Sequence, residues 1–222
     1  MGRNMNLQRW VIWGSVCLGI SLLTYPAFAQ KVLCYGLPNE ATLQSKLAVA
    51  VAGSNGGLGN NMWATLVAND GTVCAVAFSG TAYPDQWLGS RVISAQKANT
   101  ANDFSLGNGA RLNGMGLALS TANLYSAVQP GGSLYGLQHS NPVDPAVAYD
   151  GNALTFGTGA DPMIGNRIGG VNVFGGGLAL YSQGGVKIGG LGVSGDTSCT
   201  DHFVAWRLRI FCSSTTSCPF PG

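Results

Sequence analysis

The chain after residue 38 opens with apolar positions at helical spacing. Leu43, Leu47 and Ala50 recur on one helix face, and Asn39 stands where an N-cap is expected. The pattern predicts a helix over residues 39–51.

Two apolar runs follow and predict a β-hairpin. The runs cover residues 62–68 and 72–78, and the tripeptide Asn69-Asp70-Gly71 separates them. Asn, Asp and Gly are the residues that tight hairpin turns favour, because such turns need positive φ angles.

Two helices are predicted next, over residues 87–103 and 112–128. The second is rich in small residues, namely Gly114, Gly116, Ala118 and Ala122. Such a face could pack closely on the sheet of the same chain or on a second copy of it.

The C-terminal part alternates glycine turns with apolar runs. Residues 166–181 predict a strand, a glycine bend and a strand, and residues 186–193 predict the last strand. A last helix is expected over residues 201–211, with Thr197 or Ser198 as its N-cap. The order of helices and strands indicates an α+β fold.

Residues 130–161 interrupt these patterns with repeated Gly and Pro turn signals. We interpret the segment as a long inserted loop within one domain that spans residues 30–222. Long loops in compact domains often carry function, but a surface decoration or an oligomer contact explains the segment equally well.

The first 29 residues have the features of a secretory signal peptide. Arg3 and Arg9 are basic, residues 10–23 are apolar, and Ala27-Phe28-Ala29 is a small-x-small cleavage site. We therefore expect a mature chain that begins at Gln30 and is periplasmic or secreted. An uncleaved membrane anchor is the alternative.

Cleavage would leave a chain without net charge. The sequence has 11 Lys and Arg and 9 Asp and Glu, and the signal segment removes two of the basic residues. A near-neutral chain does not suit nucleic-acid binding, which needs a basic surface.

An exported chain is expected to form disulfides. Of the six cysteines, five follow the cleavage site. We expect at least one disulfide between two of Cys34, Cys199, Cys212 and Cys218, and we interpret Cys74, in an apolar strand, as a core thiol.

Three blocks of the chain are similar to one known family. Residues 68–76 look like its first hairpin, and residues 94–101 look like the helix that follows, although Gln96 replaces an acidic residue that members often carry. Residues 184–195 form a glycine-rich strand between two turns. In their order and spacing these blocks resemble the GlcG/HbpS family of haem-binding and haem-responsive proteins, whose relatives include the C-terminal domain of PduO-type proteins.

The resemblance implies a single domain with a profilin-like antiparallel sheet of about five strands flanked by helices. It also implies a homo-oligomer and a bound haem (heme) or related tetrapyrrole. An apolar slot would hold the macrocycle, with Arg or Lys near its propionates.

Haem iron is usually held by His, Met, Cys or Tyr, and the chain has two histidines. His202, directly after the glycine signature, is our first candidate ligand of the haem iron, and His139, in the predicted insertion, is the second. His202 could instead be a packed helix-start residue and His139 an exposed loop residue. Asp201 is interpreted as a partner of the helix dipole, and Met163 as core filler.

Other chemistries lack their motifs in the sequence. There is no Gly-x-Ser-x-Gly elbow, His-Glu-x-x-His site, Cys-x-x-Cys pair or phosphate-binding loop. The preferred interpretation is an exported haem-binding protein for sensing, scavenging or storage. An oligomeric interaction module without a cofactor, or a weak enzyme acting on haem or a small organic acid, are the alternatives.

Overall fold

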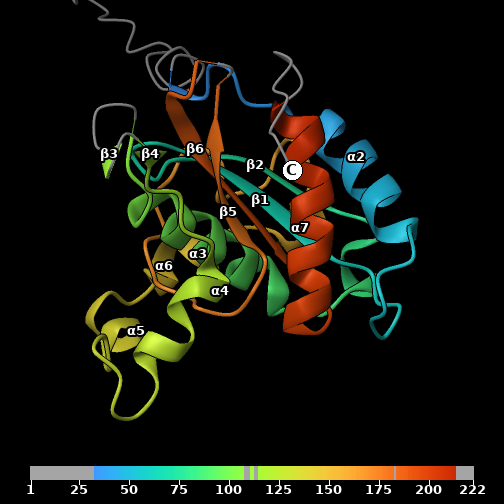
Figure 1. Ribbon diagram of the computed structural model, residues 1–222. Coiled ribbons are helices and arrows are strands. Elements are labelled where there is room, and N and C mark those ends of the chain that lie inside the picture. The colour runs from blue at the N-terminus through green and yellow to red at the C-terminus, as the bar shows by residue number, and fades with distance from the viewer. Residues whose placement is uncertain (1–32, 108–110, 113–114, 183, 214–222) are drawn as a thin grey trace, which may run out of the picture.

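A computed structural model of the chain describes residues 33–107, 111–112, 115–182 and 184–213. The predicted signal peptide, residues 1–29, lies outside the described residues. The fold is α+β, as predicted, and is built around a four-stranded antiparallel sheet in the order β2-β1-β6-β5 (Figure 1). Among the described residues, no helix combines the length and apolar character needed to cross a membrane.

The larger elements are helices α2 (Glu40–Ala52), α3 (Ser90–Asp103) and α7 (Ser198–Ser213) and strands β1 (Trp63–Ala68), β2 (Val73–Phe78), β5 (Gly177–Tyr181) and β6 (Lys187–Ser194). The shorter ones are β3 (Arg111–Leu112), β4 (Met115–Gly116), α4 (Thr121–Leu124), α5 (Leu137–Ser140), α6 (Pro145–Ala148) and the 3-10 turns η1 (Tyr83–Asp85), η2 (Ser126–Val128) and η3 (Ala153–Thr155).

The first helix and the hairpin form for the local reasons expected. The Asn39 side chain caps α2 by accepting a hydrogen bond from the Thr42 amide at 2.9 Å. Between β1 and β2 the chain turns through Gly71, whose φ of +83° favours glycine. Both elements confirm the predictions.

Helices cover both faces of the sheet. Helices α2 and α7 pack on one face, where Ala64 and Leu66 of β1 join their core. Helix α3 lies on the other face, where Trp63 and Val67 of the same strand are fully buried. The alternation along β1 gives each face its own core.

The helix predicted over residues 112–128 is wrong. The described part of this segment contains the short strands β3 and β4, then α4 and η2. The Leu106 amide donates to the Leu117 carbonyl at 2.7 Å, and Ser105 hydrogen-bonds both the amide and the carbonyl of Leu119. These bonds fold the segment back on itself, and the proposed small-residue helix face does not form.

The strand predicted at the start of residues 166–181 is also absent, because only β5 forms there. Residues 166–173 run beside the sheet in irregular conformation and add apolar side chains such as Ile168 and Val173 to the core. The main sheet therefore has four strands rather than about five, and β3 and β4 form a separate pair.

The observed disulfide joins Cys34 to Cys74, across 40 residues. The interpretation of Cys74 as a core thiol was wrong, because β2 is an edge strand and Cys74 is its one incompletely buried residue. Cys199 is exposed and Cys212 is buried. Cys218 lies outside the described residues.

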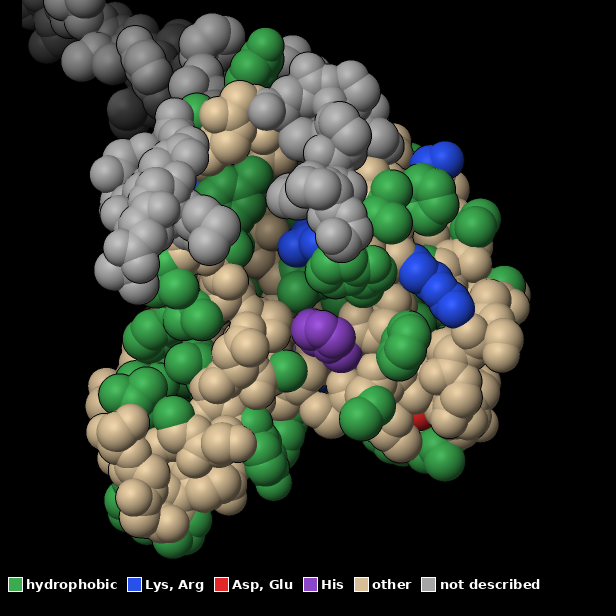
Figure 2. Space-filling view, in the orientation of Figure 1, with side chains coloured by type: hydrophobic (Ala, Val, Ile, Leu, Met, Phe, Trp, Pro, Cys, Tyr) green, Lys and Arg blue, Asp and Glu red, His purple; other side chains and the backbone are tan. Residues whose placement is uncertain are grey.

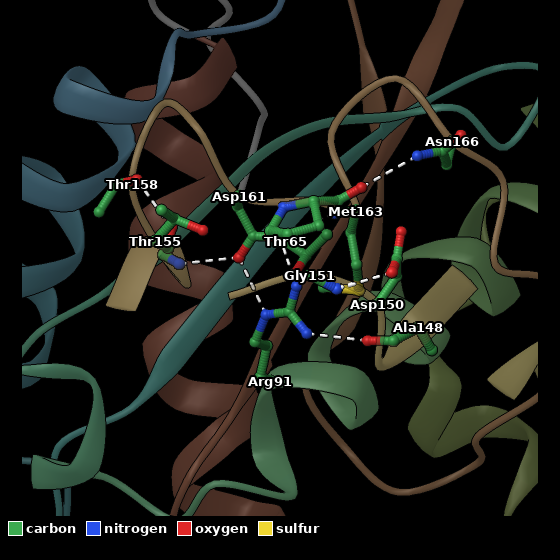
Figure 3. A network of polar contacts seen from close by, with 12 residues as sticks. Thr65, Arg91, Ala148, Asp150, Gly151, Thr155, Thr158, Asp161, Met163 and Asn166 are labelled. Carbon is green, nitrogen blue, oxygen red and sulfur yellow. Dashed lines mark hydrogen bonds and ion pairs between the residues drawn. The ribbon is translucent and has the colours of Figure 1, made fainter. Parts of the chain in front are cut away.

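Residues 130–161 are structured and contain the short helices α5 and α6 and the turn η3. The second half of the segment packs against α3 and β1. Asp161 accepts hydrogen bonds from the buried Arg91 side chain, and Arg91 also donates to the Ala148 carbonyl at 2.8 Å (Figure 3). This part of the segment is therefore structural cover for the sheet. That the segment is an insertion stays a prediction.

Candidate functional site

The start of α7 is fixed by the loop that precedes β1. Asp196 accepts hydrogen bonds from the amides of Leu58, at 2.9 and 3.0 Å, and Asn60, at 3.2 Å. Thr197 caps the helix, because its hydroxyl accepts from the Thr200 amide at 3.3 Å. The cap is one of the two that the sequence predicted.

A buried ion pair anchors the first turn of α7 to α3 and β6. The Lys97 ammonium lies 2.7 Å from the Asp201 carboxylate and donates to the Val193 carbonyl at 3.1 Å. The other oxygen of Asp201 accepts from the amides of Gly195 and Asp196. Because His202 follows Asp201 directly, this pair fixes the backbone that carries the imidazole.

Burial acts against both charges of this pair. It lowers the pKa of Lys97 and raises that of Asp201, while their mutual attraction opposes both shifts. The interpretation of Asp201 as only a dipole partner was therefore incomplete, because its main partner is a lysine 104 residues away in the sequence.

A pocket of about 290 Å³ opens beside α7, and we call it the α7 pocket. One wall is the helix face with His202, Trp206 and Arg209, which share that face by their spacing of four and three. The facing wall comes from Ala118, Leu119, Ser120 and Asn123 and from Leu178 and Ala179 of β5, and its polar groups belong to Ser120 and Asn123. Figure 2 shows a histidine side chain in a hollow on this side of the molecule.

The His202 imidazole is half-buried, and its lowered pKa favours the neutral form. Its pKa is lowered by burial first, and then by the positive charges of Arg209 and Lys97. Its Nδ1 atom is enclosed and has no hydrogen-bond partner among the described residues. A neutral imidazole nitrogen is a common metal ligand in proteins.

Trp206 and Arg209 give the pocket an aromatic surface and a positive charge. The Arg209 guanidinium lies over the Trp206 ring, 4.2 Å from its centre. Trp206 is about half exposed, so part of its side chain faces the pocket opening. The pocket can thus offer a flat apolar ligand a ring surface, a cation and an imidazole.

His139 does not belong to the α7 pocket. It lies in the short helix α5 with its side chain exposed. Helix α5 is at the lower left of Figure 1, well separated from α7 at the right. Within one chain the structure therefore does not bring the two histidines together.

Comparison with protein families identifies the fold family. The family described as "HbpS-like: Haem degrading protein HbpS-like" matches residues 39–208. The chain belongs to the HbpS-like family.

Three solved structures are similar to this HbpS-like chain. The crystal structure of a PduOC:heme complex is 24% identical, over 78% of this chain and 91% of that one, with a TM-score of 0.49. The Klebsiella pneumoniae protein ORFY, described as DUF336, is 23% identical over 96% and 99%, with a TM-score of 0.47. The Ybr137w protein is 14% identical over 79% and 76%, with a TM-score of 0.44. No curated protein sequence matches the chain.

The glycine signature of this HbpS-like chain has a steric cause. A Cβ on Gly190 would lie 2.2 Å from the Ala98 carbonyl oxygen, and one on Gly192 would lie 1.9 Å from that of Ser94. Only glycine lets the α3 backbone rest directly on β6. Gln96, which replaces an acidic residue of the family pattern, lies against Gly170 rather than in the α7 pocket.

Sequence reasoning named His202 as a candidate ligand, which stays a prediction, and did not name the residues that line the α7 pocket with it. Trp206 and Arg209 were detectable, since they follow His202 at helical spacing and would leave a large aromatic on one face. The facing residues Ser120 and Asn123 had no such signal, because the segment was predicted as part of a longer helix.

Proposed function

We propose that this HbpS-like protein is exported and binds haem or a related tetrapyrrole in the α7 pocket, with His202 as the iron ligand. The observation that carries the proposal is the half-buried, neutral imidazole with an unpartnered Nδ1 atom, set beside Trp206 and Arg209. The family assignment supports the ligand class.

The residues of the pocket fit a haem. Iron in the bound group would supply a coordination site for an imidazole, and imidazole is a common haem ligand. Trp206 offers a surface for stacking, Leu119 and Leu178 offer apolar contact, and Arg209 can pair with a propionate. At about 290 Å³ the pocket is slightly smaller than the roughly 300–1,000 Å³ typical of ligand sites, so part of a macrocycle would lie outside it.

The disulfide supports export. A bond between Cys34 and Cys74 is expected in an oxidising compartment and is rare in the cytosol. Together with the signal-like N-terminus it favours a periplasmic or secreted protein. Mass spectrometry of protein from the native host tests this: the mature chain should begin at Gln30, and an intact N-terminus in the membrane fraction would contradict it.

A homo-oligomer remains part of the proposal. Phe203, Trp206 and Ile210 leave an apolar stripe exposed along α7, and exposed stripes of this kind often mark interfaces. Light scattering at micromolar concentration should give a multiple of the chain mass.

Titration of the mature protein with haemin tests the ligand. The parent should bind saturably with a defined Soret maximum, and His202→Ala should shift that maximum and weaken binding. His139→Ala is the matched control and should leave both unchanged.

The outcomes separate the alternatives. If neither variant changes the spectrum, the iron is not held by histidine. If the parent binds no haemin saturably, the exposed stripe on α7 favours the interaction module without a cofactor.

A further inference from the structure

A second pocket, of about 280 Å³, lies on the opposite face of the sheet from the α7 pocket. Its floor is Trp63 of β1 together with Arg91 and Val92 of α3. Its walls are Tyr83, Phe156, Ala153 and Tyr149, the last three from the segment that covers α3. We call it the aromatic pocket. We propose that it binds a small, uncharged aromatic molecule of one or two rings.

The ring geometry of the pocket suits an aromatic guest. Trp63 is fully buried, and the rings of Tyr83 and Phe156 meet edge to face, with centres 6.3 Å apart and planes at 76°. A flat guest that lies beside these rings can stack on a free ring face or meet a free ring edge, which are the two favoured aromatic arrangements.

The polar groups of the floor are already engaged, which selects against a charged guest. The Trp63 indole donates to the Trp87 carbonyl at 3.1 Å. The Arg91 guanidinium is paired with Asp161 and lies over the Phe156 ring, 3.7 Å from its centre. A carboxylate guest would have to compete with Asp161, and an ammonium guest would lose water without gaining a partner.

The pocket is held open by a rigid frame. The Arg91 side chain donates hydrogen bonds to the Ala148 carbonyl and the Asp161 carboxylate and so holds residues 148 and 161 of the covering segment against α3 (Figure 3). The Asp161 carboxylate also accepts hydrogen bonds from the amides of Gly157 and Met163. A Cβ on Gly157 would lie 2.3 Å from the Phe78 ring, so this wall sits tightly on the sheet. A pre-formed pocket lowers the ordering cost of binding.

The volume limits the size of the guest. A dry cavity of about 150 Å³ is enough for benzene, so the aromatic pocket can take a bicyclic molecule such as indole. The inference rests on the rings that line this pocket and does not depend on haem binding.

Calorimetric titration of the mature protein with indole tests the proposal. Indole should bind saturably, and indole-3-acetate should bind at least about tenfold more weakly, because its charge has no partner. Ala153→Phe fills the pocket and should weaken indole binding at least about tenfold, while Ala160→Phe, on an exposed position of the same segment, should leave it within about twofold.

A second variant guards against misfolding. Leu88 lines the pocket but is 58% exposed, so Leu88→Ala should fold and weaken indole binding about threefold. The proposal is overturned by a lack of saturable indole binding, by equal affinity for indole-3-acetate, or by unchanged binding in both pocket variants. The proposal is also overturned if His202→Ala weakens indole binding as much as Ala153→Phe does, since indole would then occupy the α7 pocket.

Discussion

The contact between α3 and the glycine strand β6 can be tested with a single methyl group. In Gly192→Ala the new Cβ would lie 1.9 Å from the Ser94 carbonyl oxygen, 2.5 Å from the Ala98 amide nitrogen and 3.0 Å from the Lys97 Cβ. Two of these three neighbours are backbone atoms, so no side-chain rotation relieves the clash.

The magnitude follows from the displacement required. Ordinary contact begins near 3.4 Å, so α3 must retreat by about 1.5 Å at this point. Overpacking a core costs about 1–3 kcal/mol and occasionally more, and a clash between backbones belongs at the upper end. We expect a loss of about 3 kcal/mol, which lowers the Tm of a domain of this size by roughly 6–12 °C.

Differential scanning calorimetry of the purified protein measures this loss. Gly159→Ala is the matched control, because a Cβ there meets nothing within 4 Å, and its Tm should stay close to that of the parent. If the Tm of Gly192→Ala lies within 2 °C of that of the parent, the steric explanation of the glycine signature is wrong. The same holds if Gly159→Ala lowers the Tm as much as Gly192→Ala does. A shift of 2 °C corresponds to roughly 1 kcal/mol.

Three further predictions concern the disulfide, the buried ion pair and His202. Replacing both Cys34 and Cys74 by Ser should lower the free energy of unfolding in urea by about 4 kcal/mol, because the disulfide closes a loop of 40 residues and so reduces the entropy of the unfolded chain. An unchanged urea midpoint would show that the disulfide does not constrain the unfolded chain. Lys97→Met should lower the free energy of unfolding by about 3–5 kcal/mol, because it leaves the Asp201 carboxylate buried without its cation. Adding Asp201→Asn to this variant should restore much of the lost stability. If it restores none, the broken ion pair is not the cause of the loss. The free energy of unfolding should fall as the pH drops below about 6.5, because His202 takes up a proton more readily in the unfolded chain than in the folded one. His202→Gln should make the free energy of unfolding depend less on pH in this range. An NMR titration that gives His202 a pKa above 6.5 in the folded protein would contradict the expected direction.

Predictions from local sequence patterns were correct where contacts between neighbouring residues determine the structure. The Asn39 cap and the turn through Gly71 each depend on a few neighbouring residues, and both formed as predicted. The predicted helix over residues 112–128 failed, and two of its small residues, Gly114 and Gly116, have low helix propensity. Hydrogen bonds from Ser105 and Leu106 to residues 117–119 decided that segment instead.

The sequence by itself determined the α+β class, the glycine strand that admits α3, and the place of His202 at the start of the last helix. Tertiary structure alone decided which groups meet there and elsewhere: the Lys97–Asp201 pair, the bond from Cys34 to Cys74 and the facing wall of the α7 pocket. Helix and turn signals come from residues three or four apart, whereas these contacts join residues 40 to 104 apart. Their energy depends on burial and distance, which exist only once the sheet has brought the segments together.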